Sequence, residues 1–250
     1  MTIFYSVLTF IFGLAIGSFL NVCIYRLPRQ ESIVSPGSRC PYCGHSLGAG
    51  DLIPLVSFIM LNRKCRYCGK EISLRYFFVE LITALLFVAV YVRFMFYERS
   101  PLLFVSYLIL CSGLIVITFI DLEHKLIPDK ITYPGMAVGL IISLFSGKFL
   151  PSLFGLAIGV GLLYLIVFLS RGGMGGGDVK LAAMLGAFLG WKLLLLNLFL
   201  SFLFGGVIAT ILLLLKIKGR KDYIPFGPYL ALAGIVTIFW GRQILFWYGL

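Results

Sequence analysis

Long apolar runs separated by short polar segments dominate the chain. A helix needs about 20 apolar residues to cross a hydrocarbon core roughly 30 Å thick. Residues 1–25, 101–120 and 193–215 meet this length without a charged residue. Five further apolar stretches lie at residues 77–96, 131–146, 151–170, 181–190 and 228–250. The pattern predicts an all-α polytopic membrane protein with about eight transmembrane helices, of which those at 131–146 and 181–190 are the shortest.

Composition favours the same class of protein. Hydrophobic residues make up 60% of the chain and charged residues only 12%, and the mean hydropathy is +1.04. A soluble domain of this length needs many more polar side chains to cover its hydrated surface. The composition therefore excludes an ordinary soluble protein.

The basic residues are distributed unequally between the two sides of the predicted spans. Lys and Arg accumulate in the cytoplasmic loops of membrane proteins. With the N terminus outside, 5 of the 21 Lys and Arg lie on the outer side, which leaves 16 on the cytoplasmic side. This predicts an even number of spans with both termini outside. The net charge of +11 then reflects topology and attraction to anionic lipid, so we expect a lipid membrane and no nucleic acid as partner.

The polar segments divide the chain into three parts. The first apolar run has no basic residue before it, whereas Arg26 and Arg29 follow it directly. That order is typical of a signal anchor that is retained rather than cleaved. Residues 26–76 form the only long polar segment. We therefore expect a transmembrane helix at 1–25, a cytoplasmic loop domain at 26–76 and a membrane-embedded domain at 77–250.

The polar segment carries two Cys-x-x-Cys pairs, which are typical of a zinc site. The pairs are Cys40 with Cys43 and Cys65 with Cys68. Each two-residue gap lets both sulfurs face one ion, and four thiolates suit tetrahedral zinc. Gly44 and Gly69 follow the two pairs and permit the tight turns that a knuckle requires. Because four sulfurs leave no position open for water, we expect structural zinc rather than a catalytic metal.

Other interpretations of the cysteines are less favourable. Disulfides are rare in the reducing cytosol, where the distribution of charge places this loop. Unpaired surface thiols are the remaining alternative. Cys23 and Cys111 lie inside apolar runs, where cysteine usually packs as a small hydrophobic residue. His45 is expected to be a surface residue, since the four cysteines already suffice as ligands.

Two of the ten acidic residues lie at the edge of predicted spans. Asp121 ends the span at 101–120, and Asp178 follows a glycine-rich run. A carboxylate at the edge of hydrocarbon is costly unless it is paired, hydrated or functional. The predicted topology puts both on the cytoplasmic face, where they could meet. Two adjacent carboxylates can activate water and protonate the departing group when an amide is hydrolysed.

The helix ends suggest a division of roles between these carboxylates. Asp121 sits at a helix C terminus, whose negative dipole end disfavours ionisation, whereas Asp178 sits where a helix begins. We therefore expect Asp178 to be the resting base and Asp121 the acid. Taken singly, Asp121 is equally well explained as a charge facing water, and Asp178 as an ordinary helix cap.

The residues before Asp178 form a run of five glycines in six positions, residues 172–177. Glycine adopts backbone shapes that are closed to other residues. Gly175, Gly176 and Gly177 would therefore let an extended substrate strand lie close to Asp178. A phosphate-binding loop is the main competitor, but the run lacks the GxxxxGK[ST] pattern and no strand precedes it.

Further acidic and basic residues near Asp121 have simpler explanations. Glu123, His124 and Asp129 are expected to be interfacial residues. Asp129 follows Ile127 and Pro128, and its side chain could cap the next helix.

The chain resembles the type IV prepilin peptidases in four separated motifs. These are GSFLNV followed by RLP (residues 17–28), the paired Cys-x-x-Cys knuckles, residues 121–129 with IPD at their end, and GGGD followed by a lysine (residues 175–180). A segment near the end, IPFGP at 224–228, resembles another part of the family. The motifs cover nearly the whole chain in the expected order.

The resemblance implies a fold, an activity and partners. Asp121 and Asp178 would be the catalytic aspartates of a GxGD-type aspartyl protease domain within 77–250. The enzyme would remove the short basic leader of prepilins or related pseudopilins, in pilus or type II secretion systems, at the cytoplasmic face of the bacterial inner membrane. The resemblance also implies cleavage after a glycine and N-methylation of the new first residue with S-adenosyl-L-methionine. The residues that would bind this methyl donor are unknown.

Two other classes of protein share part of the pattern. A polytopic transporter or channel also uses intramembrane aspartates and glycine-broken helices, but it leaves the cysteine loop unexplained. An assembly factor that docks proteins through the cysteine loop leaves the glycine–aspartate motif unexplained. Cleavage of a prepilin in detergent separates the peptidase from both, because transport needs sealed vesicles and docking creates no new N terminus.

Overall fold

The fold is all-α. The computed structural model describes residues 2–170, 174–217, 219 and 224–249. In these residues the only β-structure is two isolated antiparallel bridges, Arg39 with Ser46 and Lys64 with Glu71. The chain divides into two compact units, unit 1 at Met1–Val116 and unit 2 at Ile117–Leu250. The division follows packing, whereas the predicted domain borders at 25 and 76 follow the polar loop and stay a prediction.

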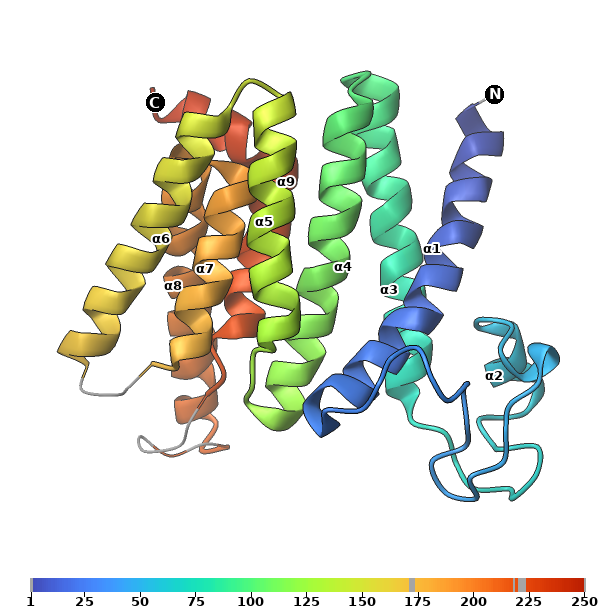
Figure 1. Ribbon diagram of the computed structural model, residues 1–250. Coiled ribbons are helices and arrows are strands. Elements are labelled where there is room, and N and C mark those ends of the chain that lie inside the picture. Colours follow the sequence, from blue (N-terminus) through green and yellow to red (C-terminus); the bar gives the residue numbers. More distant parts are fainter. Residues whose placement is uncertain (1, 171–173, 218, 220–223, 250) are drawn as a thin grey trace. The chain divides into compact units, whose positions relative to one another are not determined.

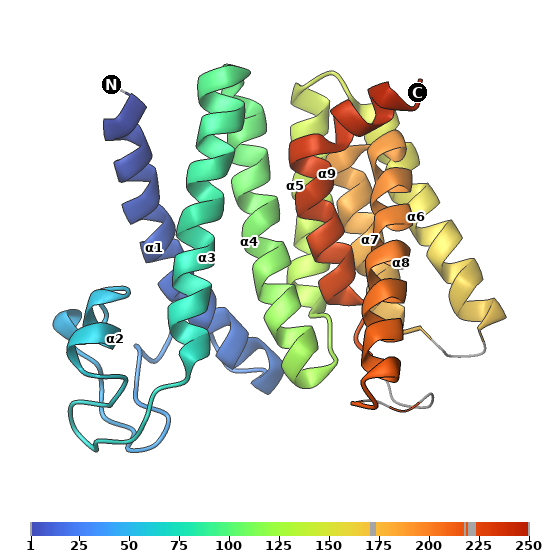
Figure 2. The same ribbon diagram turned by 180° about the vertical axis from the view of Figure 1, so that it is seen from behind.

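Unit 1 contains three long helices and the polar loop, all shown in Figure 1. The long helices are α1 (Thr2–Arg26), α3 (Leu74–Val90), which continues as a π-helix η3 (Tyr91–Tyr97), and most of α4 (Pro101–His124). The loop holds η1 (Leu27–Arg29), η2 (Ala49–Asp51) and the single-turn α2 (Val56–Met60). Figure 2 shows the loop at the end of the unit where α1 ends and α3 begins.

Helices α1 and α3 pack closely because α1 carries glycine at their interface. Gly13 and Gly17 are four residues apart, a spacing that lets the backbones of neighbouring membrane helices approach. A Cβ added at Gly17 would lie 2.7 Å from the Cα of Glu80, and one at Gly13 would lie 2.6 Å from the Cα of Ala84. The motif at 17–28 thus begins with a glycine that the packing requires.

Polar groups also connect the loop to the two helices that flank it. The Asn21 amide donates to the carbonyl of Tyr76 (3.1 Å) and joins α1 to α3. The buried Glu80 carboxylate accepts the backbone N–H of Leu55 (2.8 Å), which ties the start of α2 to α3. The Arg26 guanidinium donates to two loop carbonyls, those of Ser32 and Gly37. The loop is therefore fastened to the helices rather than suspended from them.

Unit 2 consists of the last two turns of α4 and five further helices. They are α5 (Asp129–Phe145), α6 (Phe149–Leu169), α7 (Gly176–Leu189), α8 (Trp191–Leu214) and α9 (Gly227–Trp247). Both views show the first turns of α5, α7 and α9 at the same end of the unit as the last turn of α4 (Figures 1 and 2). Side chains from four separate segments can therefore meet at this end.

Helix α7 is the centre of unit 2. It packs against α5, α6, α8 and α9, and 10 of its 14 residues are buried. At 1.5 Å per residue a helix of this length is about 21 Å long. Small residues let its neighbours approach, since Gly186 meets the backbone of Gly155 on α6, and Ala182 meets Gly159. Such a helix is positioned from all sides, which suits an element that carries a functional group.

The helices confirm a polytopic membrane protein. Among the described residues, six helical segments are long and apolar enough to cross a membrane: Thr2–Arg29, Leu74–Tyr97, Pro101–His124, Phe149–Leu169, Trp191–Leu214 and Gly227–Trp247. The two shortest predicted spans correspond to α5 and α7, which have 17 and 14 residues. The total of eight spans stays a prediction, because these two helices fall short of the length that identifies a span.

We expect Gly186→Ala to destabilise unit 2, because the new methyl group would overlap the Gly155 backbone. Overpacking of a close interface typically costs about 1–3 kcal/mol. The matched control is Gly161→Ala on α6, where an added Cβ meets nothing within 4 Å. Thermal unfolding in detergent should show a lower Tm for Gly186→Ala and an unchanged or higher one for the control. Equal Tm values would contradict the packing described here.

Candidate active site and metal centre

Asp121 lies in the last turn of α4 and is buried, with 3% of its surface exposed. Its Oδ2 atom accepts the backbone N–H of Gly227 at 3.0 Å. Gly227 is the first residue of α9, whose N terminus has a partial positive charge. This hydrogen bond and helix end favour a negative charge on Asp121, and they offset the negative C-terminal end of its own helix.

Gly227 has no room for a side chain. A Cβ there would lie 2.6 Å from Oδ2 of Asp121 and 3.3 Å from Cδ1 of Ile127. The IPFGP segment at 224–228 therefore contributes a backbone donor to the candidate site. Composition and spacing could not indicate this role, because Gly227 follows Asp121 by 106 residues. The signal in the sequence was the segment's likeness to a family motif, without a function attached.

Asp178 is the third residue of α7 and is also 3% exposed. Its backbone N–H donates to the carbonyl of Gly175, the residue that precedes the helix (3.1 Å). Asp121 and Asp178 interact electrostatically. The structure thus brings together the two carboxylates that the sequence singled out, 57 positions apart.

The glycines before Asp178 have different surroundings. A Cβ at Gly176 would meet nothing within 4 Å, whereas one at Gly177 would lie 2.9 Å from Cβ of Ile127. Gly176 is exposed and Gly177 is half-buried. Gly172 and Gly173, also in the run, lie outside the described residues. Within the run, Gly176 has open space beside it and Gly177 makes room for Ile127.

Ile127 connects the two sides of the candidate site and was not singled out from the sequence as a site residue. It lies in the turn between α4 and α5, and only 7% of it is exposed. Its side chain contacts both Gly177 and Gly227. Each of these glycines is next to, or hydrogen-bonded to, one of the two aspartates.

The sequence suggested that the Asp129 side chain could cap α5, but it does not. It is the first residue of α5, Pro128 is the N-cap residue, and no side chain caps the helix. The carboxylate instead forms an ion pair with Lys180 on α7. Glu123 and His124 are exposed, and Oε2 of Glu123 lies 3.9 Å from Nε2 of His124.

The four predicted cysteines converge in unit 1. The sulfur atoms of Cys40, Cys43, Cys65 and Cys68 all lie within 4.8 Å of one another. Cys40 Sγ and Cys68 Sγ are 3.8 Å apart. Zinc–sulfur bonds of about 2.3 Å in a tetrahedron place sulfurs ~3.8 Å apart. The cluster therefore has the ligand type, the number and the approximate spacing of a four-cysteine zinc site.

The two knuckles have the same backbone geometry. In each knuckle, the backbone carbonyl of the first cysteine accepts a hydrogen bond from the backbone N–H of the glycine four residues later. The bonds run from Gly44 to Cys40 and from Gly69 to Cys65, and both are 2.9 Å long. Gly44 has φ +71° and Gly69 has φ +69°, a conformation that favours glycine. The sequence prediction that these glycines form tight turns is confirmed.

Electrostatics in the cluster favour a bound cation. Burial of Cys40 opposes its ionisation, but the amides of Cys43 and Tyr42 lower the pKa of its thiol to about 7. For Cys68, a hydrogen bond from the backbone of Lys70 lowers the pKa of the thiol. Desolvation and the neighbouring sulfurs outweigh this bond and raise the pKa of Cys68 to about 11. Four sulfurs this close cannot all be thiolates without a cation. A zinc ion would supply that charge and fix the loop.

Contacts around the cysteines hold the knuckles together. The Asp51 carboxylate accepts bonds from Arg66 (2.8 Å) and Tyr67 (3.2 Å), two residues of the second knuckle. Partial desolvation opposes its ionisation, but the Gly48 amide and Arg66 hold the pKa of Asp51 below its usual value. The His45 ring stacks on Tyr67 at 3.7 Å and, as expected, is exposed and outside the sulfur cluster.

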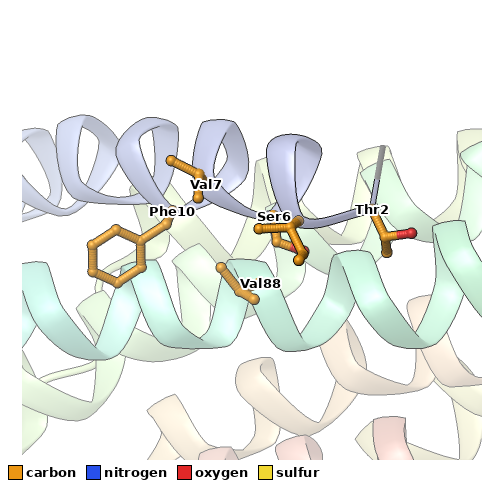
Figure 3. A pocket seen from close by; sticks show the side chains of 6 residues that line it. Thr2, Ser6, Val7, Phe10 and Val88 are labelled. Atoms are coloured by element: carbon orange, nitrogen blue, oxygen red, sulfur yellow. The ribbon is translucent and has the colours of Figure 1, made fainter.

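Unit 1 also has an apolar groove between α1 and α3 (Figure 3). It is lined by Thr2, Ile3, Ser6, Val7, Phe10 and Val88. None of these side chains ionises near neutral pH. The groove therefore offers no acid–base or metal-binding chemistry.

The fold and the two clusters define a class: a polytopic membrane protein with a buried carboxylate pair in one unit and a four-cysteine cluster in the other. Residues 108–210 match the profile described as the Type IV leader peptidase family, and residues 11–94 match that of the Bacterial Peptidase A24 N-terminal domain. The first match contains both aspartates and the second contains all four cysteines. No solved structure matches the chain significantly.

Curated relatives agree with these matches over nearly the full length. A protein of Pseudomonas aeruginosa is 38% identical over 94% of this chain and 90% of its own length. One of Aeromonas hydrophila is 39% identical over 98% of this chain and 93% of its own. Both are named prepilin leader peptidase/N-methyltransferase. The chain belongs to the type IV leader peptidase family.

We expect the purified protein to contain about one zinc ion per chain, and Cys65→Ser to lose it, because three thiolates bind zinc less tightly than four. The matched control is Cys23→Ala, a buried cysteine of α1 outside the sulfur cluster. Elemental analysis after gel filtration measures the metal. A stoichiometric zinc content that Cys65→Ser leaves unchanged would contradict the assignment, as would a wild-type protein that binds no zinc when refolded with it.

Proposed function

We propose that this chain cleaves the basic leader peptide from type IV prepilins or related pseudopilins at the cytoplasmic face of the bacterial inner membrane, with Asp121 and Asp178 as its catalytic groups. The observation that carries the proposal is the convergence of two buried carboxylates in a member of the leader peptidase family. Family membership supplies the type of substrate, and the carboxylate pair supplies chemistry for splitting an amide.

The surroundings of the two aspartates suggest their resting states. Asp121 has a backbone donor in Gly227 and the N terminus of α9 beside it. Both favour the charged form. Asp178 also lies in the first turn of a helix and has a backbone hydrogen bond with Gly175, but its ionisation is opposed by burial and by the charge of Asp121. We therefore assign the negative charge to Asp121 and the shared proton to Asp178. This reverses the assignment drawn from helix ends alone, which lacked the contribution of α9.

The reaction follows from that protonation state. The Asp121 carboxylate takes a proton from a water molecule while the water oxygen bonds to the scissile carbonyl carbon. Asp178 gives its proton to the carbonyl oxygen, which forms a neutral tetrahedral intermediate. As the carbon–nitrogen bond breaks, Asp121 gives its new proton to the departing amine and Asp178 recovers a proton from the hydroxyl. The pair returns to its starting state.

The glycine run supports the approach of an extended substrate. The open space beside Gly176 lets a peptide backbone pass close to the start of α7. Gly175 and Gly177 flank this position in the same turn. The scissile bond would then lie next to Asp178, which follows directly in the chain.

The same chain also methylates the new N-terminal residue, with S-adenosyl-L-methionine as the methyl donor. The relatives' names support this second activity, and the proposal assigns no residue to the donor. Zinc in the cysteine cluster has a structural role, because four sulfur ligands leave it no position for water or substrate.

We expect Asp121→Asn and Asp178→Asn each to reduce cleavage of a purified prepilin in detergent by about 100-fold or more, since acid–base groups typically contribute factors of 10²–10⁴. The amide keeps the shape of the side chain but cannot cycle the proton. Glu123→Gln, an exposed carboxylate of the same helix end, is the control and should cleave normally. Thermal unfolding checks that each variant is folded.

Mass spectrometry of the product reports on both activities. Wild-type protein should yield a shortened chain, which gains one methyl group when S-adenosyl-L-methionine is added. Near wild-type turnover by either asparagine variant would show that its aspartate is structural and that the two-aspartate mechanism is wrong. Absence of cleavage by the wild-type protein would contradict the proposal that prepilins are the substrate.

A further inference from the structure

The turn between α4 and α5 places two similar side chains in opposite surroundings. Leu126 is 46% exposed, whereas Ile127, the next residue, is 7% exposed. The turn begins with Lys125 at φ +54°, and its backbone N–H donates to the carbonyl of Asp121 (2.9 Å). The backbone thus turns four positions after Asp121, and Ile127 is buried while Leu126 is exposed.

Ile127 fills the space between the two backbone segments that carry the site. A Cβ at Gly177 would lie 2.9 Å from Cβ of Ile127, and a Cβ at Gly227 would lie 3.3 Å from its Cδ1. Gly177 precedes Asp178, and Gly227 is the hydrogen-bond donor to Asp121. The Ile127 side chain therefore sets the distance between the backbone at Gly177, which carries Asp178, and the backbone at Gly227, which binds Asp121.

An ion pair also connects α5, the helix that follows this turn, to α7. Lys180 Nζ lies 2.6 Å from Oδ1 of Asp129, and it also lies 5.4 Å from the ring centroid of Tyr133. Asp129 follows Ile127 by two positions, and Lys180 follows Asp178 by two positions. The pair therefore joins the first residue of α5 to the fifth residue of α7, one helical turn or less from Asp178 along the chain.

The exposure of this ion pair limits what it contributes to stability. The side chains of Lys180 and Asp129 are 34% and 53% exposed. Ion pairs this accessible to solvent typically contribute about 0–1 kcal/mol to folding. A link of this strength is better suited to holding local geometry than to holding the helices together.

We propose that Ile127 and the Asp129–Lys180 ion pair position the two carboxylates, with Ile127 as a spacer and the ion pair as a clamp on the turn that carries it. This inference rests on the proposed peptidase function. Neither element exchanges protons with the substrate, so both are positioning residues. Displacement of reacting groups by about 1 Å can cost a factor of about 10² in rate, which makes kcat the sensitive quantity.

The spacer is tested by Ile127→Ala against Leu126→Ala, which removes the same type of side chain from the adjacent exposed position. Ile127→Ala should lower kcat for prepilin cleavage by about 10- to 100-fold with KM changed less than about threefold. Leu126→Ala should stay within about twofold of wild type in both constants. Ile127→Val, which keeps the branched Cβ beside Gly177, should recover most of the lost kcat.

The clamp is tested by exchange of its charges. Asp129→Asn and Lys180→Met should each lower kcat, by about 3- to 30-fold, without a matching change in KM. The double variant Asp129→Lys with Lys180→Asp should be at least about threefold faster than either single variant, because the attraction is restored. Tm values close to wild type would confirm that these losses do not come from unfolding.

The outcomes separate this inference from the proposed function. If Asp121→Asn and Asp178→Asn are inactive while Ile127→Ala matches Leu126→Ala, the spacer is wrong and the peptidase mechanism stands. If the exchanged pair is no faster than the single variants, the clamp is wrong. If KM rises and kcat is unchanged, these residues bind substrate and do not position the carboxylates. Near wild-type cleavage by Asp121→Asn or Asp178→Asn would instead contradict the proposed function.

Discussion

Burying two carboxylates that interact electrostatically is the constraint on which unit 2 depends. Like charges in a partly dry site repel each other, so the pair holds a shared proton or needs compensating positive charge. The Gly227 amide, at the start of α9, supplies part of that compensation to Asp121. This requires α9 to begin within hydrogen-bonding distance of the end of α4, and it leaves Gly227 without space for a Cβ. Helix α7, enclosed by four neighbours, holds Asp178 in its first turn, where its carboxylate interacts electrostatically with that of Asp121.

In unit 1 the corresponding constraint is the shape of the polar loop between α1 and α3. Its loop is too polar and too short to form a hydrophobic core of its own, so its shape depends on cross-links. Four sulfurs gather at one point, and Glu80 and Arg26 fasten the loop to α3 and α1. The family relationship covers both units, since separate profiles match residues 11–94 and 108–210. The four-cysteine cluster and the two buried aspartates therefore each lie within a segment that a family profile matches.

Much of this architecture could be predicted from local pattern. Apolar runs predicted the helices, two-residue gaps predicted the convergence of the cysteines, and Asp121 and Asp178 stood out as acidic residues at the ends of apolar runs. The roles of Gly227, Ile127 and the Asp129–Lys180 pair could not be found in this way, because each depends on a contact between segments remote in sequence. The resting protonation that we propose differs from the one suggested by the helix ends, because each helix end reports only on its own residue and the hydrogen-bond donor to Asp121 comes from α9.

The most direct test of the central claim is the protonation of the two carboxylates themselves. The chain has five aspartates, so 13C labelling of the aspartate carboxyl carbons gives few NMR signals, assignable with the asparagine variants. At neutral pH, in detergent, we expect Asp121 to show the chemical shift of a carboxylate and Asp178 that of a carboxylic acid. On titration each signal should respond to the ionisation of the other group. Two signals that titrate independently, each at the ordinary pKa of an aspartate, would contradict a shared site.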